Sequence, residues 1–280
     1  TRHFRFMLEG LIEIEEKLKA INIGFVIRVG EPLMILRELA QEAVLVVMDK
    51  AYDSYGKAIR AKLKEVISCS NFVVDTNLII PVDSAYPKEA YAAYAIRPSI
   101  MRRLFDYVDH PQLLKPDIGF SEQIQSERLI DLNSFMALHL NGLDYVPKSS
   151  RFISGENAAI AKLKLFVENG LERYETNQSN PATEGTSMLS PYLHFGQISP
   201  LAILKSVLAS GKNADAFIEQ LVVRRELAYN FVYYSESDLK DLSTVLPNWA
   251  NETLAVHKHD LRDPLYSLEV LEQAKTHDEF

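Results

Sequence analysis

The sequence predicts an α/β domain with a parallel sheet, followed by an all-helical domain. In residues 1–110, helical patterns alternate with short apolar runs, which is typical of βαβ units. From about residue 151 onward, apolar residues recur at three- and four-residue steps, and no convincing strand pattern interrupts them. The chain has 280 residues, of which 47% are apolar. This is enough for one large domain or two ordinary ones with packed cores.

The N-terminal half is predicted to open on an amphipathic helix over residues 5–21, where apolar residues repeat at helical spacing. Apolar runs predict three strands, at 23–29, 43–48 and 71–75. Helices are expected between and after them, at 33–41, 54–68 and 89–108. The alternation indicates a Rossmann-like parallel sheet. Because the chain opens on a helix, we expect at least one further strand upstream.

A polar stretch punctuated by proline, residues 111–150, is expected to connect the two domains, which occupy 1–110 and 151–280. Helices are predicted in the second domain near 155–173, 191–195, 200–209, 214–234, 249–257 and 267–276. Ser190-Pro191 and Ser199-Pro200 each place a hydroxyl before a proline, which predicts two N-caps. Gly211 is expected to end the 200–209 helix.

Charge and composition narrow the functional classes. The net charge is −8, and residues 1–110 carry 15 basic and 15 acidic side chains, so the excess acid lies in the second half. A protein that binds nucleic acid through bulk positive charge is disfavoured, and any DNA contact needs a local basic patch. No apolar run is long enough to span a membrane. Because the first residues lack a basic stretch followed by an apolar one, we expect no secretion signal.

The single cysteine, Cys69, excludes an internal disulfide and indicates a reduced, cytoplasmic setting. His257, His259 and His277 do not have zinc-ligand spacing, so we expect no metal site. Lys258 and Arg262 beside these histidines either contact DNA phosphates or belong to a solvated loop. Nothing in the pattern indicates an obligate protein partner, and a monomer is expected.

The first candidate site precedes the helix predicted at 191–195. Three hydroxyl residues, Thr186, Ser187 and Ser190, follow a flexible glycine at 185. Free backbone N–H groups and the positive end of a helix dipole favour an anion at such a position. The alternative is a capped helix with spare hydroxyls.

The second candidate site is the helix Phe217–Phe231. At 100° per residue, Arg224 falls in the middle of an apolar stripe, Gln220 lies at its edge, and Glu226 lies on the opposite face. A guanidinium on an apolar face is costly unless it is paired. Arg224 therefore pairs either with a carboxylate from another helix or with a ligand phosphate, which suits its planar fork. Glu226 is expected to face solvent or another helix.

Several motifs together resemble the DNA photolyase and cryptochrome superfamily, and most closely its class II cyclobutane-pyrimidine-dimer photolyases. The segment Leu189–Ser199 resembles the family's flavin-phosphate segment, and Leu221–Leu227 resembles the class II form of its flavin helix. The similarity covers most of the chain and is strongest over 174–278. Further matches in order and spacing are Phe6–Leu11, Trp249-Ala250, Thr253-Leu254, His257, Asp260, Arg262, Leu265–Ser267, Leu271-Glu272 and Thr276–Asp278.

The resemblance implies an N-terminal α/β domain and an all-α FAD-binding domain. It implies light-driven repair, in which reduced FADH⁻ passes an electron to a pyrimidine dimer flipped out of UV-damaged DNA. By motif, the phosphates of FAD would be held by Thr186, Ser187, Met188, Leu189, Ser190 and Arg224, and Tyr174 would be a flavin contact. Gln220 would take the catalytic position that touches both flavin and lesion. An antenna chromophore of unknown identity would lie between the domains.

The sequence departs from the family pattern at three places. Position 220 is Gln where the family has a carboxylic acid, and Gln cannot supply a proton. Asn177–Pro181 stands where class II members tend to have Arg-Asn-Asp-Pro. The chain also ends at Phe280, where the family continues through further helices and tryptophans. We therefore expect the 280 residues alone to bind FAD poorly or not at all and to be inactive.

Two rival functions remain open at this stage. One is a blue-light photoreceptor of the cryptochrome type, which binds FAD without repairing DNA and which Gln220 keeps open. The other is a non-photochemical nucleotide-binding or scaffold protein, in which residues 186–196 are only a helix cap.

Overall fold

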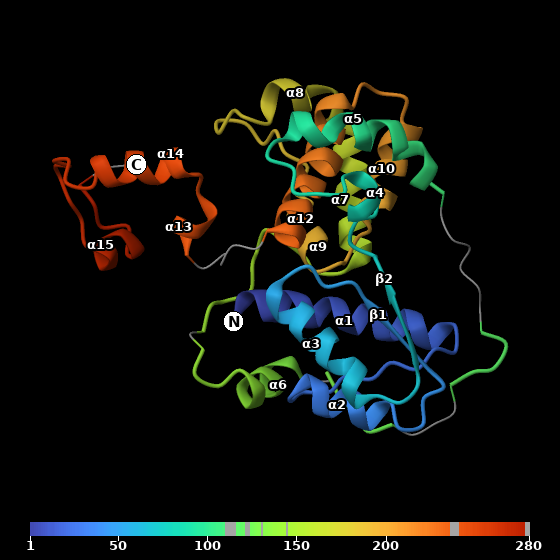
Figure 1. Ribbon diagram of the computed structural model, residues 1–280. Coiled ribbons are helices and arrows are strands. Elements are labelled where there is room, and N and C mark those ends of the chain that lie inside the picture. Colours follow the sequence, from blue (N-terminus) through green and yellow to red (C-terminus); the bar gives the residue numbers. More distant parts are fainter. Residues whose placement is uncertain (110–115, 121–123, 130, 144, 236–240, 278–280) are drawn as a thin grey trace. The chain divides into compact units, whose positions relative to one another are not determined.

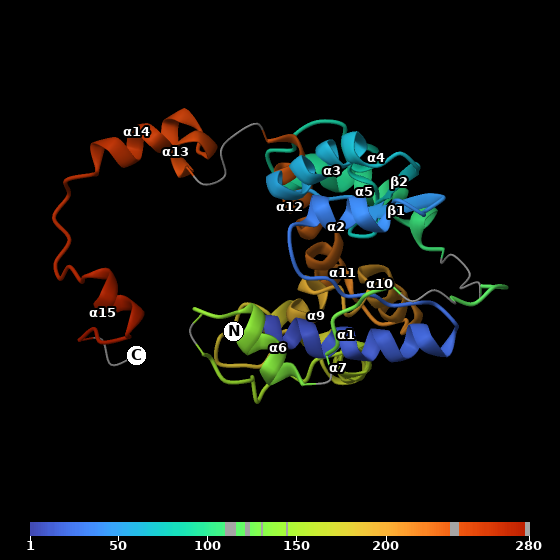
Figure 2. The ribbon, with the colours of Figure 1, turned by 90° about the horizontal axis from the view of Figure 1, so that it is seen from below.

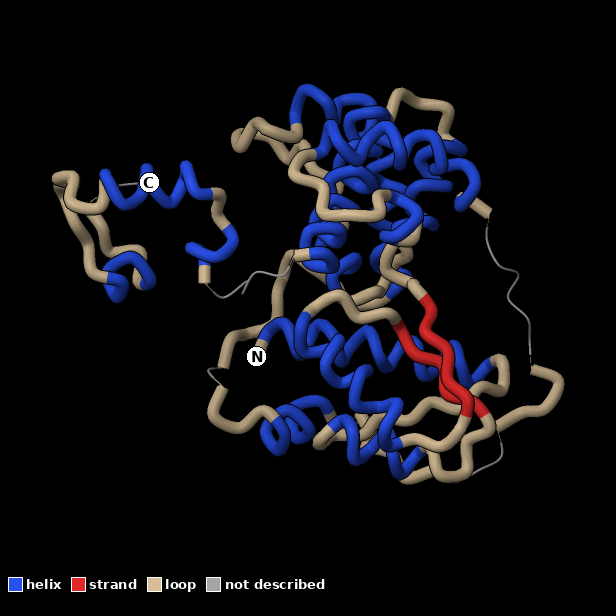
Figure 3. Tube along the Cα trace, viewed as in Figure 1, coloured by secondary structure: helices blue, strands red, loops and turns tan. Residues whose placement is uncertain are grey.

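The computed structural model describes residues 1–109, 116–120, 124–129, 131–143, 145–235 and 241–277. Two compact units are formed, Thr1–Tyr234 and Ser235–Phe280. Figure 1 follows the chain from the N-terminal helix α1 (Arg2–Ala20) through the elements of the first unit. In the part of the chain that is described, helices far outnumber strands (Figure 3).

The sheet is a parallel pair, β1 (Leu45–Asp49) and β2 (Ser70–Val74). Leu45 pairs with Ser70 and Asp49 with Val74. Helix α3 (Ser54–Val66) joins the two strands and begins at Asp53, whose carboxylate accepts a hydrogen bond from the N–H of Gly56. Helix α2 (Pro32–Leu39) precedes β1. Two of the three predicted strands and the βαβ alternation are therefore confirmed.

The prediction of a strand at 23–29 is wrong. Residues 23–29 are irregular in the structure and do not pair with β1 or β2. This part of the chain is instead hydrogen-bonded to Phe120, Ser126 and Glu127. The N–H of Phe120 donates to the carbonyl of Asn22 (3.1 Å), and the N–H of Glu127 donates to the carbonyl of Ile27 (2.8 Å). The N–H of Ile27 donates to the hydroxyl of Ser126. The acceptor for Ile27 is therefore a side-chain hydroxyl, whereas in a β-sheet it would be a backbone carbonyl of the neighbouring strand. This substitution interrupts regular strand pairing.

The remainder of the first unit is helical. In chain order its elements are α4 (Val82–Ala85), α5 (Ala93–Arg103), η1 (Leu104–Tyr107), α6 (Leu132–His139), α7 (Glu156–Asn169), η2 (Leu171–Arg173), α8 (Tyr174–Asn177), α9 (Ser190–His194), α10 (Pro200–Ala209), α11 (Asp215–Ile218), η3 (Glu219–Arg224) and α12 (Arg225–Tyr234). The helix predicted at 200–209 is confirmed at both ends. The helix predicted at 214–234 is also present, but η3 within it is a π-helix.

The two predicted N-caps have different outcomes. The Ser199 hydroxyl accepts a hydrogen bond from the N–H of Leu201 and caps α10 as predicted. Ser190 is not a cap, because the helix already begins at Ser190 and the residue in the cap position is Leu189. Gly211 has a positive φ of 65° just beyond α10, which agrees with its predicted role as a helix stop.

The hydrophobic core of the first unit draws on both predicted domains. Buried residues that precede position 110, such as Phe6, Ile80 and Ile96, belong to one cluster with Tyr192, Leu204 and Val222. Helix α1 lies beside α6 in both ribbon views (Figures 1 and 2), and its Phe6 ring packs against Tyr192 at 5.5 Å between ring centres. The compact unit therefore runs through the expected connector at 111–150, and the division at 1–110 and 151–280 stays a prediction.

Gln197 ties α1 to the turn after α9. This side chain is buried, its Nε2 donates to the carbonyl of Phe6 (3.0 Å), and its Oε1 accepts from the N–H of Gly155 (2.9 Å). Gly10 of α1 lies so close to Gln197 that a Cβ there would come within 2.9 Å of the amide carbon. Gln197 belongs to Leu189–Ser199, the segment that resembles the family's flavin-phosphate motif. At least this residue of the segment therefore holds the fold together.

The second unit contains α13 (Leu242–Val245), α14 (Asn248–Val256) and α15 (Leu268–Glu272). None of the described residues of these three helices is buried, and Trp249 is largely exposed. Throughout the described part of the chain, the helices are too short or too polar to cross a membrane.

Candidate functional site

The segment before α9 is anchored at both ends by buried side chains. Tyr174 lies at the start of α8, and its ring packs edge-on against Phe217 (5.2 Å) and Phe166 (5.8 Å). Burial raises the pKa of the Tyr174 hydroxyl. At the other end, Leu189 is fully buried in the same core. The stretch between these anchors is therefore held at two fixed points while its middle stays near solvent.

The predicted hydroxyl cluster lies on the exposed part of this segment. Thr186 and Ser190 are exposed, and Ser187 is half-buried. The Ser187 hydroxyl accepts from the N–H of Leu189 (3.4 Å), and the Thr186 hydroxyl lies 3.2 Å from the sulfur of Met188. Met188 has a φ of 56°, which is uncommon for a residue with a side chain. The backbone at Met188 therefore departs from regular helical geometry just before α9 begins.

Gly185 is required by the close approach of the chain to itself. A Cβ at this position would collide with the carbonyl group of Asn177 at the end of α8. The glycine therefore allows the loop before Thr186 to turn back onto α8.

The second predicted site has a different geometry from that expected. Residues Glu219–Arg224 form a π-helix, which inserts extra chain into the turn and rotates the following residues. As a result, the side chain of Arg224 is 54% exposed rather than placed on the apolar stripe. It pairs with Glu219 at 3.4 Å. The buried Arg224 predicted from ideal helical spacing is therefore wrong.

Arg224 shares its carboxylate partner with a second arginine. Arg97 of α5 donates two hydrogen bonds to Glu219, at 2.8 and 2.7 Å. These hydrogen bonds from Arg97, together with the nearby charge of Arg224, lower the pKa of Glu219. Because one carboxylate faces two guanidinium groups, positive charge remains in excess at this exposed corner. Gln220 is exposed on the same π-helix.

Glu226 takes the buried place that Arg224 was expected to take. Its carboxyl is only 1% exposed and accepts from the N–H groups of Ile79 (3.0 Å) and Ile80 (3.1 Å). Burial raises its pKa to about 7, while the two backbone hydrogen bonds act in the opposite direction. The prediction that Glu226 lies on the face opposite the core is wrong, because the π-helix shifts the register of α12.

One turn further along α12, Asn230 makes a similar clamp. Its Oδ1 accepts from the N–H of Ala90 (2.7 Å), and its Nδ2 donates to the carbonyls of Tyr86 (3.2 Å) and Lys88 (3.0 Å). Sequence reasoning missed both clamps. Their signal was two polar residues four apart within an otherwise apolar helix, which places both on one face.

The candidate DNA contacts Lys258 and Arg262 lie in the second unit, and both are exposed. Arg262 donates to the carbonyl of His257 at 3.3 Å, and the ring of His257 lies 2.6 Å from the carboxylate of Asp260. In the described residues, no three potential metal ligands come together. The arrangement leaves two cations available to solvent.

The exposed polar groups of the first two candidate sites fit the phosphates of a dinucleotide such as FAD. Phosphate oxygens are strong acceptors that bind hydroxyl donors and guanidinium forks. The structure provides exposed hydroxyls at Thr186 and Ser190 and an exposed, incompletely neutralised guanidinium at Arg224. In the described part of the chain, no hydrogen bond joins Arg224 to the Thr186–Ser190 segment.

Two solved structures share the fold of this chain. A solved class III photolyase from Agrobacterium tumefaciens is similar over 95% of this chain and 55% of its own, with a TM-score of 0.62 and 23% identity. A solved cryptochrome from Synechocystis is similar over 82% of this chain and 51% of its own, with a TM-score of 0.65 and 15% identity. The chain thus has the fold found in photolyases and cryptochromes.

Sequence relatives point to the same family. Residues 1–115 match the family model described as DNA photolyase. A protein named deoxyribodipyrimidine photo-lyase from Methanothermobacter thermautotrophicus is 32% identical over all of this chain and 61% of its own length. One of the same name from Potorous tridactylus is 33% identical over 99% of this chain and 53% of its own. The chain is therefore similar to DNA photolyases, and it spans little more than half the length of these relatives.

Proposed function

We propose that this protein repairs cyclobutane pyrimidine dimers in DNA with light, as a class II photolyase that uses reduced FAD. The observation that carries the proposal is the similarity along the whole chain to a protein named deoxyribodipyrimidine photo-lyase. The assignment to class II rests on the motifs over 174–278, above all Leu221–Leu227 and the ordered matches that follow it.

The hydroxyl segment before α9 and Arg224 would together hold FAD by its phosphates. The hydroxyls of Thr186, Ser187 and Ser190 would donate to phosphate oxygens, with backbone N–H groups of Met188 and Leu189 beside them. Arg224 would neutralise a phosphate from the π-helix. When bound, reduced FAD would supply the electron that splits the dimer.

Two further residues of the chain would act around the cofactor. Tyr174 would support the flavin-facing segment from within the core, through its contacts with Phe166 and Phe217. Gln220 would lie at the flavin and lesion, where its amide can donate and accept hydrogen bonds but cannot release a proton.

UV-damaged DNA would be the substrate, and Lys258 and Arg262 would contact its backbone phosphates. Such contacts position the duplex without reading its sequence. Because they depend on charge, they would weaken steeply as salt increases.

A second chromophore would have room beside the sheet. A hollow of about 560 Å³ is lined by residues from α1, from the ends of β1 and β2 and from the turn after α9. Arg225 lines this hollow, and in the described part of the chain its buried Nη1 has no hydrogen-bond partner. A polar group of an antenna chromophore would satisfy this nitrogen.

The test is an absorption spectrum of the protein purified from its native cells in the dark, followed by blue light with an oligonucleotide that contains dimers. Flavin absorption and loss of dimers in the light, but not in a dark control, are expected. If flavin is present and dimers persist, the photolyase activity is refuted.

The second candidate function is a photoreceptor that binds FAD without repair. The observation that favours it is Gln220 in place of the family's carboxylic acid. The same experiment separates the two, because a photoreceptor would keep its flavin response and leave the dimers intact. Complete absence of flavin would instead favour the nucleotide-binding or scaffold alternative.

A further inference from the structure

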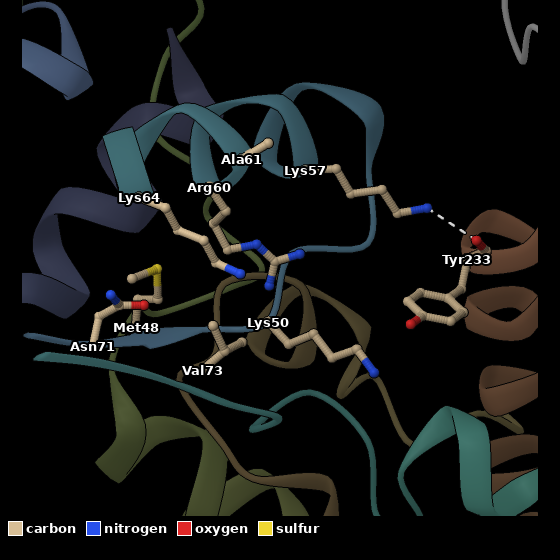
Figure 4. A pocket seen from close by; sticks show the side chains of 9 residues that line it. All are labelled: Met48, Lys50, Lys57, Arg60, Ala61, Lys64, Asn71, Val73 and Tyr233. Carbon is tan, nitrogen blue, oxygen red and sulfur yellow. Dashed lines mark hydrogen bonds between the residues drawn. The ribbon is translucent and has the colours of Figure 1, made fainter. Parts of the chain in front are cut away.

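A second, strongly basic hollow lies between α3 and one face of the strand pair. Its volume is about 380 Å³, and Lys50, Lys57, Arg60 and Lys64 line it together with Tyr233 of α12 (Figure 4). None of the residues predicted to bind FAD lines this hollow. It is therefore distinct from the proposed cofactor site.

The cations converge because of their spacing on α3. Residues 57, 60, 61 and 64 are three and four apart, so they share one face of the helix. This face is normally apolar where a helix packs on a sheet. Here Lys57, Arg60 and Lys64 occupy it, and Figure 4 shows Arg60 and Lys64 directed toward the space beside Val73. Lys50 joins them from the residue that follows β1.

The positive charge in the hollow is largely uncompensated. Lys57 donates to the backbone carbonyls of Val232 (3.2 Å) and Tyr233 (3.1 Å), and Arg60 donates to those of Asp49 and Ala51. Carbonyl groups accept hydrogen bonds but carry no net charge. Considering only described residues, the structure gives no carboxylate within ion-pair distance of Lys57, Arg60 or Lys64.

Lys50 is the exception, because it pairs with Asp83 at 3.4 Å. Its ammonium group also lies 4.5 Å from the ring centre of Tyr233. Burial lowers the pKa of Lys57, and the neighbouring charges of Arg60 and Lys50 add to this effect while Asp53 opposes it. A bound anion would relieve the repulsion among these cations.

We propose that this hollow binds a small organic phosphate about the size of a nucleoside monophosphate. The cations of α3 would hold the phosphate, since Lys and Arg are the usual protein partners of phosphate groups. Met48, Val73 and the Tyr233 ring would contact the organic part. The volume lies at the small end of the range for ligand pockets, which favours a small molecule over a nucleic-acid strand.

Calorimetric titration of the 280-residue chain tests the proposal, with uridine monophosphate as the probe. We expect saturable binding of uridine monophosphate, weaker competing binding of inorganic phosphate, and none of uridine. Absence of saturable binding of uridine monophosphate at millimolar concentration would overturn the proposal. Binding of uridine as tight as that of uridine monophosphate would also overturn the proposal.

Two single-charge variants of α3 provide the decisive comparison. Lys64→Gln removes a cation that lines the hollow, whereas Lys62→Gln removes an exposed one that does not. We expect Lys64→Gln to weaken uridine monophosphate binding about tenfold, as for loss of one charge-assisted hydrogen bond. Lys62→Gln should leave it unchanged, and circular dichroism should show both variants folded.

Equal weakening by the two variants would indicate general charge attraction and would overturn the proposal. The proposal would also be overturned if duplex DNA bound through Lys64 and uridine monophosphate did not bind. The basic hollow would then be a nucleic-acid contact. These measurements need neither flavin nor light, so their outcome is independent of the proposed repair function.

Discussion

At the scale of single residues, Glu226 makes stability depend on pH. Burial raises the pKa of its carboxyl from the ordinary value of 4.5 to about 7 in the folded protein. A carboxyl with a raised folded pKa contributes stability that is present below the unfolded pKa and is lost as pH rises through the folded value. We expect the wild type to lose up to about 3 kcal/mol of unfolding free energy, relative to Glu226→Gln, between about pH 4.5 and 7.5.

Glu226→Gln is a suitable comparison because its amide oxygen can still accept from Ile79 and Ile80. Urea denaturation of both proteins at several pH values measures the difference. Glu65→Gln, an exposed position on α3, serves as the control and should show no such trend. A difference between wild type and Glu226→Gln that is constant with pH would contradict the expectation.

Arg224 permits a direct test of the proposed phosphate contact. Arg224→Ala should weaken the binding of FAD by the full-length protein about tenfold, because a charge-assisted hydrogen bond is lost. Arg224→Lys should be intermediate, since it keeps the charge without the planar fork. Fluorescence titration of FAD measures both.

Folding should not be affected by either change at position 224, because Arg97 still pairs with Glu219. Lys164→Ala, which removes an exposed cation of α7, is the matched control. Equal affinities for FAD in Arg224→Ala and in the wild type would remove Arg224 from the proposed site.

At the scale of elements, regular helices with clear end signals could be predicted from sequence. Helix α10 lies at the predicted residues, because Ser199, Pro200 and Gly211 mark its ends and apolar spacing marks its face. Strands β1 and β2 were predictable from their continuous apolar runs. The failure at 23–29 arose because an apolar run does not reveal its hydrogen-bond partner, which here is the segment around Ser126.

The π-helix explains why the second site was only partly predictable. Sequence reasoning assigned 100° per residue to the whole of 214–234, and that value holds only for an α-helix. Beyond Glu219 the extra residue moves Arg224 outward and Glu226 inward. The residue types that matter could thus be identified, but the face on which each lies could not.

Packing of α1 on the turn after α9 provides a prediction at the element scale. Gly10→Ala would force Gln197 to move, and Gln197 is buried with hydrogen bonds to Phe6, Ser154 and Gly155. We expect a loss of about 1–3 kcal/mol of unfolding free energy, as for overpacking in other cores. Glu16→Ala on the exposed side of α1 is the control. Urea denaturation measures both, and equal stabilities would refute the docking role of Gly10.

At the scale of the whole molecule, the buried core draws on residues from both sides of the expected connector, and the domain division itself stays a prediction. A change from α/β to helical patterning in the sequence indicates where the element types change, but a core is defined by contacts. Phe6 and Ile80 pack in one cluster with Tyr192 and Val222, and the clamps at Glu226 and Asn230 join α12 to residues 79–90. Periodicity in the sequence does not reveal which distant segments such contacts join.

The same distribution of contacts predicts that residues 1–234 fold without the second unit. All the buried apolar residues of the described chain lie between Phe6 and Val223, within the first unit. Removal of residues 235–280 should therefore change the unfolding free energy by less than about 1 kcal/mol, because surface changes away from a core have small effects. Urea denaturation, followed by circular dichroism, compares the 1–234 chain with the 280-residue chain.

A deletion at the N-terminus tests whether the small effect expected for removal of residues 235–280 is specific to that segment. Removal of residues 1–20 deletes α1 with its buried Phe6 and Leu8 and leaves Gln197 without its partner on that helix. This deletion should abolish the cooperative transition or lower its midpoint strongly. If the 1–234 chain lost its transition as well, stability would depend on the second unit, and the view of the first unit as self-sufficient would be wrong.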